Sequence, residues 1–247
     1  MRTAVFASRN SKEILRDPTS LAFGIGFPLV LLILLSAINA GVPKEANMTL
    51  FHIEKLSPGI SVFGLSFLAL FSAMLISKDR STSFMMRLFI SPMKPSDFIL
   101  GYILPIIPMA LAQSAICYLF ALFYGMPFSV DLLLAVAVNL PIAVFFISLG
   151  LLFGSVLNEK AVGGICGALV TNLSAWFSNI WFDTAMVGGA FKKVADILPF
   201  SHAVNAARAA ASGDYAAIFP ELWIVIAYAA ALLVAAVVIF SIRLKKN

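Results

Sequence analysis

The chain has 247 residues, of which 61% are apolar and 12% charged, and its mean hydropathy is +0.99. A soluble domain carries about 25% charged residues, so this composition excludes an ordinary soluble domain and predicts a polytopic membrane protein. The net charge of +5 is then a property of the loops, and no basic surface with interleaved aromatic residues points to nucleic acid. Cys117 and Cys166 lie inside apolar runs and predict neither a metal site nor a disulfide.

The amino-terminal segment, residues 1–17, is amphipathic and is followed by Pro18. Its apolar side chains face charged ones with helical spacing: Val5, Phe6, Ile14 and Leu15 against Arg9, Lys12, Glu13 and Arg16. We predict an interfacial helix that lies on the membrane surface. The segment is too polar for a cleaved signal peptide, so the first apolar run is expected to remain as a membrane anchor.

Six apolar runs each approach the ~20 residues that a helix needs to cross the hydrocarbon at 1.5 Å per residue. They lie at about residues 19–39, 57–77, 100–124, 130–156, 161–182 and 220–242. We therefore predict an all-α polytopic membrane protein with six transmembrane helices, organised as a single transmembrane domain over residues 1–247.

The basic residues of the connections predict the orientation. If the amino terminus is inside, the inner segments carry twelve Lys and Arg residues and the outer segments carry five. The positive-inside rule then places both termini in the cytoplasm. We expect a multi-pass protein of the plasma membrane, which in a bacterium is the inner, cytoplasmic membrane.

The connection between the second and third runs, residues 78–98, is basic and amphipathic. A helix from about Ser81 would carry an apolar face of large side chains and a rim of cations, and Pro92 and Pro95 would stop it. The face comprises Phe84, Met85, Met86, Leu88 and Phe89, and the cations are Lys78, Arg80, Arg87 and Lys94. Such a helix fits a docking element for a cytosolic protein, and it also fits a helix resting on the lipid interface.

The last outer connection, residues 183–219, is long and too apolar for a solvated loop. Ser201 as N-cap and Gly213 as C′ residue frame a short helix over about 202–212. Residues 186–197 predict another, separated from the first at Pro199. The pair fits a re-entrant hairpin in the outer leaflet, and it fits an ordinary interfacial helix equally well.

Uncharged polar and aromatic residues inside the runs mark a candidate substrate route, because polar groups at that depth face protein or a water-filled cavity. They are Gln113, Asn139, Asn172, Ser174, Trp176, Ser178 and Asn179. Hydrogen bonds between helices explain the polar ones just as well. The first five runs lack an ionisable residue near the midplane, which argues against ion-driven transport and favours an amphipathic or apolar cargo. The G-x-x-x-G pairs Gly150/Gly154 and Gly163/Gly167 are candidate helix contacts.

Two stretches carry a family resemblance. RLFISPMKPSDFILGYIL, residues 87–104, joins a basic and apolar helix through a small residue and proline to the Gly that opens the third run. ILPFSHAVNAARAA, residues 197–210, has a Leu-Pro pair followed by an Arg. With six spans and both ends inside, the chain resembles the permease subunit of a type-2 ATP-binding-cassette (ABC) exporter of the multidrug or peptide exporter family. On that match Pro199 and Arg208 take the motif positions.

The resemblance implies a transport subunit that is not itself an enzyme and has no catalytic residues. A cytosolic ABC ATPase, in two copies, would bind the ATP and Mg, and this chain contains no G-x-x-x-x-G-K-[ST] phosphate loop. A second copy of this or a similar permease would complete a dimer in membrane lipid. The helix after residue 80 would be the coupling helix, with Phe84, Met85, Leu88 and Phe89 as packing residues and Arg80 and Arg87 as its polar rim. The expected substrate is a drug, peptide or lipid-like molecule.

Two other classes fit six spans. An ion-coupled secondary transporter would show an inverted repeat, and no self-similarity links residues 19–124 with 130–242. A non-catalytic structural membrane subunit would look the same from sequence. A membrane hydrolase is disfavoured because His52 and His202 lie outside the runs without a second ligand at metal spacing.

Overall fold

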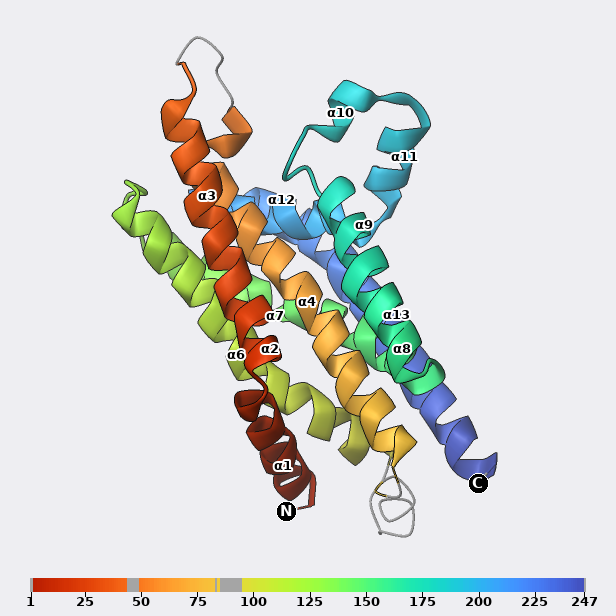
Figure 1. Cartoon of the computed structure of the whole chain (residues 1–247). Helices are drawn as coiled ribbons and strands as arrows, with labels where there is room; N and C mark the ends of the chain where they lie inside the picture. The colour runs from red at the N-terminus through yellow and green to blue at the C-terminus, as the bar shows by residue number, and fades with distance from the viewer. Residues whose placement is uncertain (1, 44–48, 83, 85–94, 247) are drawn as a thin grey trace.

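A computed structural model describes residues 2–43, 49–82, 84 and 95–246 of the chain. All regular structure within these ranges is helical (Figure 1). The first helix, α1 (Arg2–Arg16), and the carboxyl end of the last lie at the same end of the bundle (Figure 1). The carboxyl end of α4 (Ile53–Ser81) lies at this end too, whereas α10 and α11 lie at the other (Figure 1).

Among the described residues, five helical segments are long and apolar enough to cross a membrane. The chain is thus a multi-pass membrane protein, as its composition predicts. The segments are α2 (Pro18–Leu21) with the π-helical turn η1 (Ala22–Gly26) and α3 (Phe27–Gly41), then α4 (Ile53–Ser81), α6 (Pro95–Phe123), α7 (Asp131–Val156) and α13 (Tyr215–Lys246). A short 3-10 turn, η3 (Thr49–Phe51), precedes α4.

The fifth predicted span is shorter than expected. Its helical stretch joins α8 (Glu159–Gly164), the π-helical η4 (Ile165–Val170) and α9 (Thr171–Trp176), so it ends six residues before the predicted end at 182. Asn179 has a φ of +59°, in the left-handed region that a helix cannot continue through. A sixth crossing over this stretch therefore stays a prediction.

The segment between α9 and α13 is helical as predicted, but its boundaries differ. The predicted helix 186–197 is in fact two, α10 (Thr184–Val187) and α11 (Gly189–Ile197), because Gly188 has a φ of +67° and breaks the helix. The next, α12 (Pro199–Ser212), begins at Pro199 and not after Ser201. Proline fits the first helical position since its missing N–H needs no partner there. Gly213 ends α12 with a φ of +75°, as predicted.

The α4 helix occupies the centre of the bundle: 89% of its most apolar window is buried, and it contacts α3, α6, α7 and α12. Its closest neighbour is α7, where Gly150 and Gly154 lie against the α4 backbone. A Cβ on Gly150 would lie 2.1 Å from the Ala69 carbonyl oxygen, and one on Gly154 would lie 2.6 Å from that of Ala73. The predicted helix contact at this glycine pair is thereby confirmed.

The second glycine pair is different. A Cβ on Gly163 would meet no atom within 4 Å, and one on Gly167 would make ordinary contact with Leu70 at 3.4 Å. Within the described part of the chain this pair makes no close helix contact.

Candidate functional site

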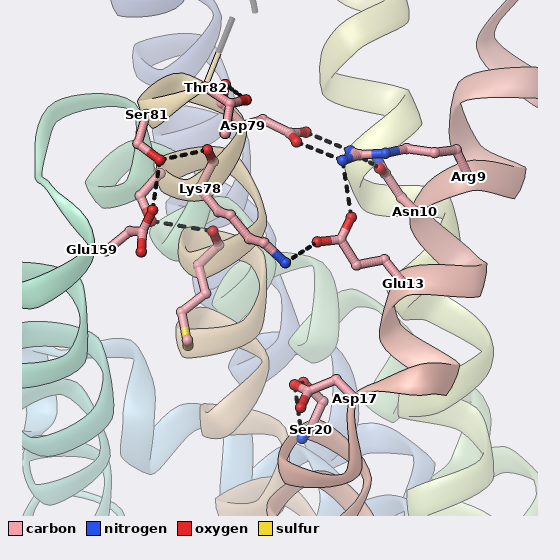
Figure 2. A network of polar contacts seen from close by, with 12 residues as sticks. Arg9, Asn10, Glu13, Asp17, Ser20, Lys78, Asp79, Ser81, Thr82 and Glu159 are labelled. Atoms are coloured by element: carbon pink, nitrogen blue, oxygen red, sulfur yellow. Dashed lines mark hydrogen bonds and ion pairs between the residues drawn. The ribbon is translucent and has the colours of Figure 1, made fainter. Parts of the chain in front are cut away.

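The last turn of α4 joins several helices through polar contacts (Figure 2). Successive residues of an α-helix point about 100° apart, so consecutive side chains at a helix end reach different neighbours. Lys78 and Asp79 contact α1, Asp79 also contacts α6, Arg80 contacts the end of α7, and Ser81 contacts α8. The connection that carries the predicted coupling helix begins at the very next residue.

Asp79 is the centre of this site. It is 2% exposed, and both Nη atoms of Arg9 in α1 donate hydrogen bonds to its carboxylate, at 2.7 and 2.8 Å. The Tyr102 hydroxyl of α6 donates a third hydrogen bond, at 2.9 Å. A buried carboxylate is tolerated only when it is paired and hydrogen-bonded, and removal of one partner of such a pair costs about 3–5 kcal/mol.

Arg9 is held in the same network. Its guanidinium also donates to Asn10 Oδ1 at 2.8 Å and lies 3.0 Å from the Glu13 carboxylate. Burial by itself would lower the pKa of Arg9, but the hydrogen bonds that it donates to Asp79 and the charges of Asp79 and Glu13 outweigh burial and raise that pKa. The guanidinium is therefore charged at any physiological pH, and α1 is tied to α4 by an ion pair.

The contact between α1 and α6 is equally close. The Asn10 amide, which is fully buried, donates to the Gly101 carbonyl at 3.0 Å. A Cβ on Gly101 would lie 2.2 Å from the Phe6 ring, so only glycine fits beneath that side chain. Phe6 also packs edge-on against Tyr102, with 5.0 Å between ring centroids. The amino-terminal helix is thus fastened to the bundle by packing as well as by charge.

The other polar residues of this turn connect α4 to α1, α7 and α8. Lys78 Nζ lies 2.7 Å from Glu13, and the Ser81 hydroxyl donates to Glu159 of α8 at 2.7 Å. Arg80 Nη1 donates to the carbonyls of Gly154 and Leu157, at 2.6 and 3.1 Å, where α7 ends. A cation at that position satisfies orphan carbonyls and complements the helix dipole. Arg80, predicted as part of the polar rim of the coupling helix, makes these contacts to α7, and its role in coupling stays a prediction.

Phe84 connects the predicted coupling segment to this site. Its ring lies beneath the Arg9 guanidinium, 4.4 Å from centroid to Cζ, and 6.3 Å from the Phe6 ring. The other predicted coupling residues, Met85, Arg87, Leu88 and Phe89, lie outside the described residues.

The candidate route residues do not come together. Gln113 and Asn139 are each 1% exposed and lie between helices: Gln113 donates to the Ser61 carbonyl of α4, and Asn139 donates to the hydroxyls of Ser61 and Ser114. In this conformation their contacts hold α4, α6 and α7 together. Their role in transport stays a prediction.

Asn172 and Trp176 are different, since both are exposed and lie one helical turn apart on α9. The Asn172 amide donates to the Ala168 carbonyl of its own helix at 2.8 Å. Ser174 faces inward and is fully buried. Ser178 and Asn179 were predicted inside the fifth span, but they follow the end of α9, where the Asn179 side chain accepts a bond from the Thr184 N–H at 2.9 Å.

The two motif residues of α12 have clear structural positions. Pro199 begins the helix and is buried. Arg208 donates to the Lys55 carbonyl at the start of α4, at 3.1 Å, and to the Asn179 carbonyl after α9, at 3.0 Å. Burial lowers the pKa of Arg208 to about 10, with Asp183 acting against that shift, so the side chain stays protonated at neutral pH.

Sequence reasoning missed several contacts between distant segments. Arg9 and Asp79 lie 70 residues apart, and the only signal was an acid at the end of an apolar run. His202, in the first turn of α12, bridges Glu221 of α13 and the Asp196 carbonyl of α11. No three His, Cys, Asp or Glu side chains in the described part of the chain are placed to hold a metal.

Comparison with known proteins identifies the family. The family model described as "ABC-2 type transporter" matches residues 2–211, which include α1, the end of α4 and the Pro199 and Arg208 positions. No individual curated protein shows a significant match to the chain. The chain belongs to the ABC-2 type transporter family and is the membrane permease component of an ABC transporter.

Proposed function

We propose that this permease is the transport subunit of an ATP-driven exporter and forms the route for an amphipathic or apolar substrate, such as a drug, a peptide or a lipid-like molecule. ABC-2 permeases work with a partner ATPase, and two copies of that subunit would bind the ATP and Mg. The observation that carries the proposal is the last turn of α4, which joins four helices directly before the connection 82–94.

This geometry suggests how movement of the ATPase would reach the membrane. A short helix held in a groove of the ATPase passes rigid-body displacement to the spans at its ends. Phe84 rests on Arg9 and Phe6, so displacement of the connection pushes on α1 and, through Asp79, on α4 and α6. Because Gly150 and Gly154 lie on the α4 backbone, α7 follows α4.

The membrane topology follows the same proposal. Both α1 and the carboxyl end of α13 would face the cytoplasm, and the α8–η4–α9 stretch would provide the sixth crossing. The helices α10, α11 and α12 would lie at the outer side as the re-entrant segment, with Arg208 joining α12 to α4 and to the loop after α9.

A second permease copy would complete the route. In the α8–η4–α9 stretch, Gly163, Asn172 and Trp176 are all exposed. An exposed small residue, an exposed amide and an exposed indole fit a stretch that packs on a second copy and borders an amphipathic cargo. Asn172 and Trp176 are exposed, which supports their predicted place on the substrate route. Gln113 and Asn139 are buried, so their predicted place on it has less support.

The first test is purification of the chain with its candidate ATPase and measurement of ATP hydrolysis. We expect stable co-purification, and we expect Phe84→Ala/Leu88→Ala to change hydrolysis several-fold. Phe123→Ala/Phe128→Ala removes two exposed aromatic rings at the opposite end of the bundle and should behave as wild type. If the wild-type chain neither co-purified with the ATPase nor altered its rate, the coupling mechanism would be wrong. Substrate uptake into proteoliposomes driven by an ion gradient alone would favour an ion-coupled carrier.

A further inference from the structure

An open groove runs along α1 toward the end of α4. It has a volume of about 980 Å³, and its walls come from α1, from Asp17 and Pro18, and from Lys78 of α4. The groove is adjacent to the Asp79 site, because Arg9 and Glu13 belong to both.

The acidic groups of the groove are already paired. Glu13 lies 3.0 Å from Arg9 and 2.7 Å from Lys78. Asp17 accepts hydrogen bonds from the backbone N–H groups of Thr19 and Ser20, both at 3.1 Å, and caps α2. Burial opposes it, but these bonds and that of the Ser20 hydroxyl lower the pKa of Asp17. Both carboxylates are therefore occupied by their own neighbours.

Two cations in the groove have no such partner. Lys12 and Arg16 lie one helical turn apart on the exposed face of α1, and no hydrogen bond or ion pair joins either side chain to the rest of the described chain. Paired positive charges with free donors, at the border between a surface helix and a span, are suited to a phosphate.

Apolar surface continues from these cations into the membrane. On α1, Val5 is 73% exposed and Leu15 is 67% exposed, beside Lys12 and Arg16. The groove ends at Pro18, where the first span begins, and only 22% of that span's apolar window is buried. The surface therefore presents cations beside the start of a span whose apolar side chains are largely exposed.

We propose that this groove binds the headgroup of an anionic phospholipid, with its phosphate between Lys12 and Arg16 and its acyl chains along the exposed face of α3. The proposal requires that the first span cross a bilayer, and it does not depend on ATP-driven export. Because Lys78 and Glu13 line the same groove, a bound lipid would also press α1 toward α4 beside the Asp79 site.

The test is binding of fluorescent phosphatidylglycerol and fluorescent phosphatidylcholine to the full chain in neutral detergent. We expect wild type to prefer the anionic lipid and Lys12→Gln/Arg16→Gln to bind it about 30-fold more weakly, since each Lys or Arg near an anionic headgroup contributes about fivefold. Lys160→Gln/Lys193→Gln removes two exposed cations elsewhere and should bind as wild type. Soluble glycerol 3-phosphate should compete far less well than the lipid.

Four results would overturn the proposal. Equal affinity for both lipids, or equal loss in the two double variants, would mean that no specific headgroup site exists. Equal competition by glycerol 3-phosphate would indicate a free-phosphate site. The fourth result is a Lys12→Gln/Arg16→Gln variant that keeps its lipid affinity but no longer co-purifies with the ATPase. The groove would then be a contact site for the ATPase, and the export proposal would stand without a lipid site.

Discussion

Two long apolar helices, α4 and α13, have opposite environments. The most apolar window of α13 has a hydropathy of 2.8 and is 22% buried, whereas that of α4 has a hydropathy of 2.2 and is 89% buried. The less apolar helix is the one inside. In a bilayer the surroundings are as apolar as leucine, so hydrophobicity does not drive one span beneath another, and close packing and hydrogen bonds decide which is central.

The composition of α4 explains its place. Buried serines recur along it, and they are Ser57, Ser61, Ser66, Ser72 and Ser77. Small side chains let the neighbouring backbones approach, and the hydroxyls of some of them donate to carbonyls. Ser72 donates to the Leu68 carbonyl at 2.7 Å and also to that of Ile147 of α7 at 3.2 Å. By contrast, α13 carries large side chains that are exposed: Trp223 at 62%, Val234 at 64% and Val238 at 49%.

The largest expected effect is at the end of α4. Arg9→Ala should destabilise the chain by about 3–5 kcal/mol, because it leaves the buried Asp79 carboxylate without its charged partner. Thermal unfolding in detergent, followed by size-exclusion chromatography, measures it. The control is Asp196→Ala, which breaks an ion pair whose side chains are 46% and 54% exposed and should cost about 0.5 kcal/mol or less. Similar losses in both variants would contradict the central role of Asp79.

The packing of α4 on α7 comes next. Gly150→Ala should cost about 1–3 kcal/mol, because its Cβ would lie 2.1 Å from the Ala69 carbonyl and the two backbones must separate. The Cβ that Gly163→Ala adds would meet no atom within 4 Å. This variant should therefore be stabilised by up to about 1 kcal/mol, because alanine has a higher helix propensity than glycine. The same stability assay applies. A Gly163→Ala variant that failed to form the proposed permease dimer would identify α8 as part of the contact between copies.

A smaller effect is expected for hydrogen bonds between helices. Asn139→Leu removes the bonds from α7 to Ser61 and Ser114, and bonds of this kind contribute about 0.6–1.7 kcal/mol in membranes. A double-mutant cycle with Ser61→Ala measures the coupling directly. Zero coupling would show that the amide contributes nothing to the α4–α7 contact.

The smallest effect belongs to α13. Val234→Ala, at a side chain 64% exposed, should change stability by no more than about 0.5 kcal/mol. Val225→Ala on the same helix is the matched control, since Val225 is fully buried and its truncation should cost about 1–2 kcal/mol. A large loss for Val234→Ala would mean that a second copy, and not lipid, covers this face.

Much of the helical framework was predictable, because the length of an apolar run depends on the bilayer and not on other helices. The predicted runs starting near 19 and 130 agree with the structure to within about two residues. The fifth run was overestimated, since Asn179 takes a left-handed conformation that hydropathy does not reveal. The start of α12 was placed at Ser201 because a serine resembles a cap, yet that hydroxyl donates to the Ala195 carbonyl at 2.8 Å.

Less of the candidate site was predictable. The basic segment after Lys78 was recognised from its charges, and Phe84 does contact the site. The bond between Arg9 and Asp79 was not anticipated, because an ion pair between residues 70 positions apart leaves no periodic signal. Gln113 and Asn139 were grouped with Asn172 because all are polar residues within apolar runs, although the first two point inward and the third does not.

The sequence by itself determined that this protein is a multi-pass membrane permease, since composition, run length and two local motifs depend only on residues close together in the chain. Only the tertiary structure decided that α4 is central, that α1 is fastened to it, and which polar residues face inward. Those properties arise from glycine contacts and from hydrogen bonds between distant segments. In a lipid environment they select the arrangement of helices that hydrophobicity leaves open.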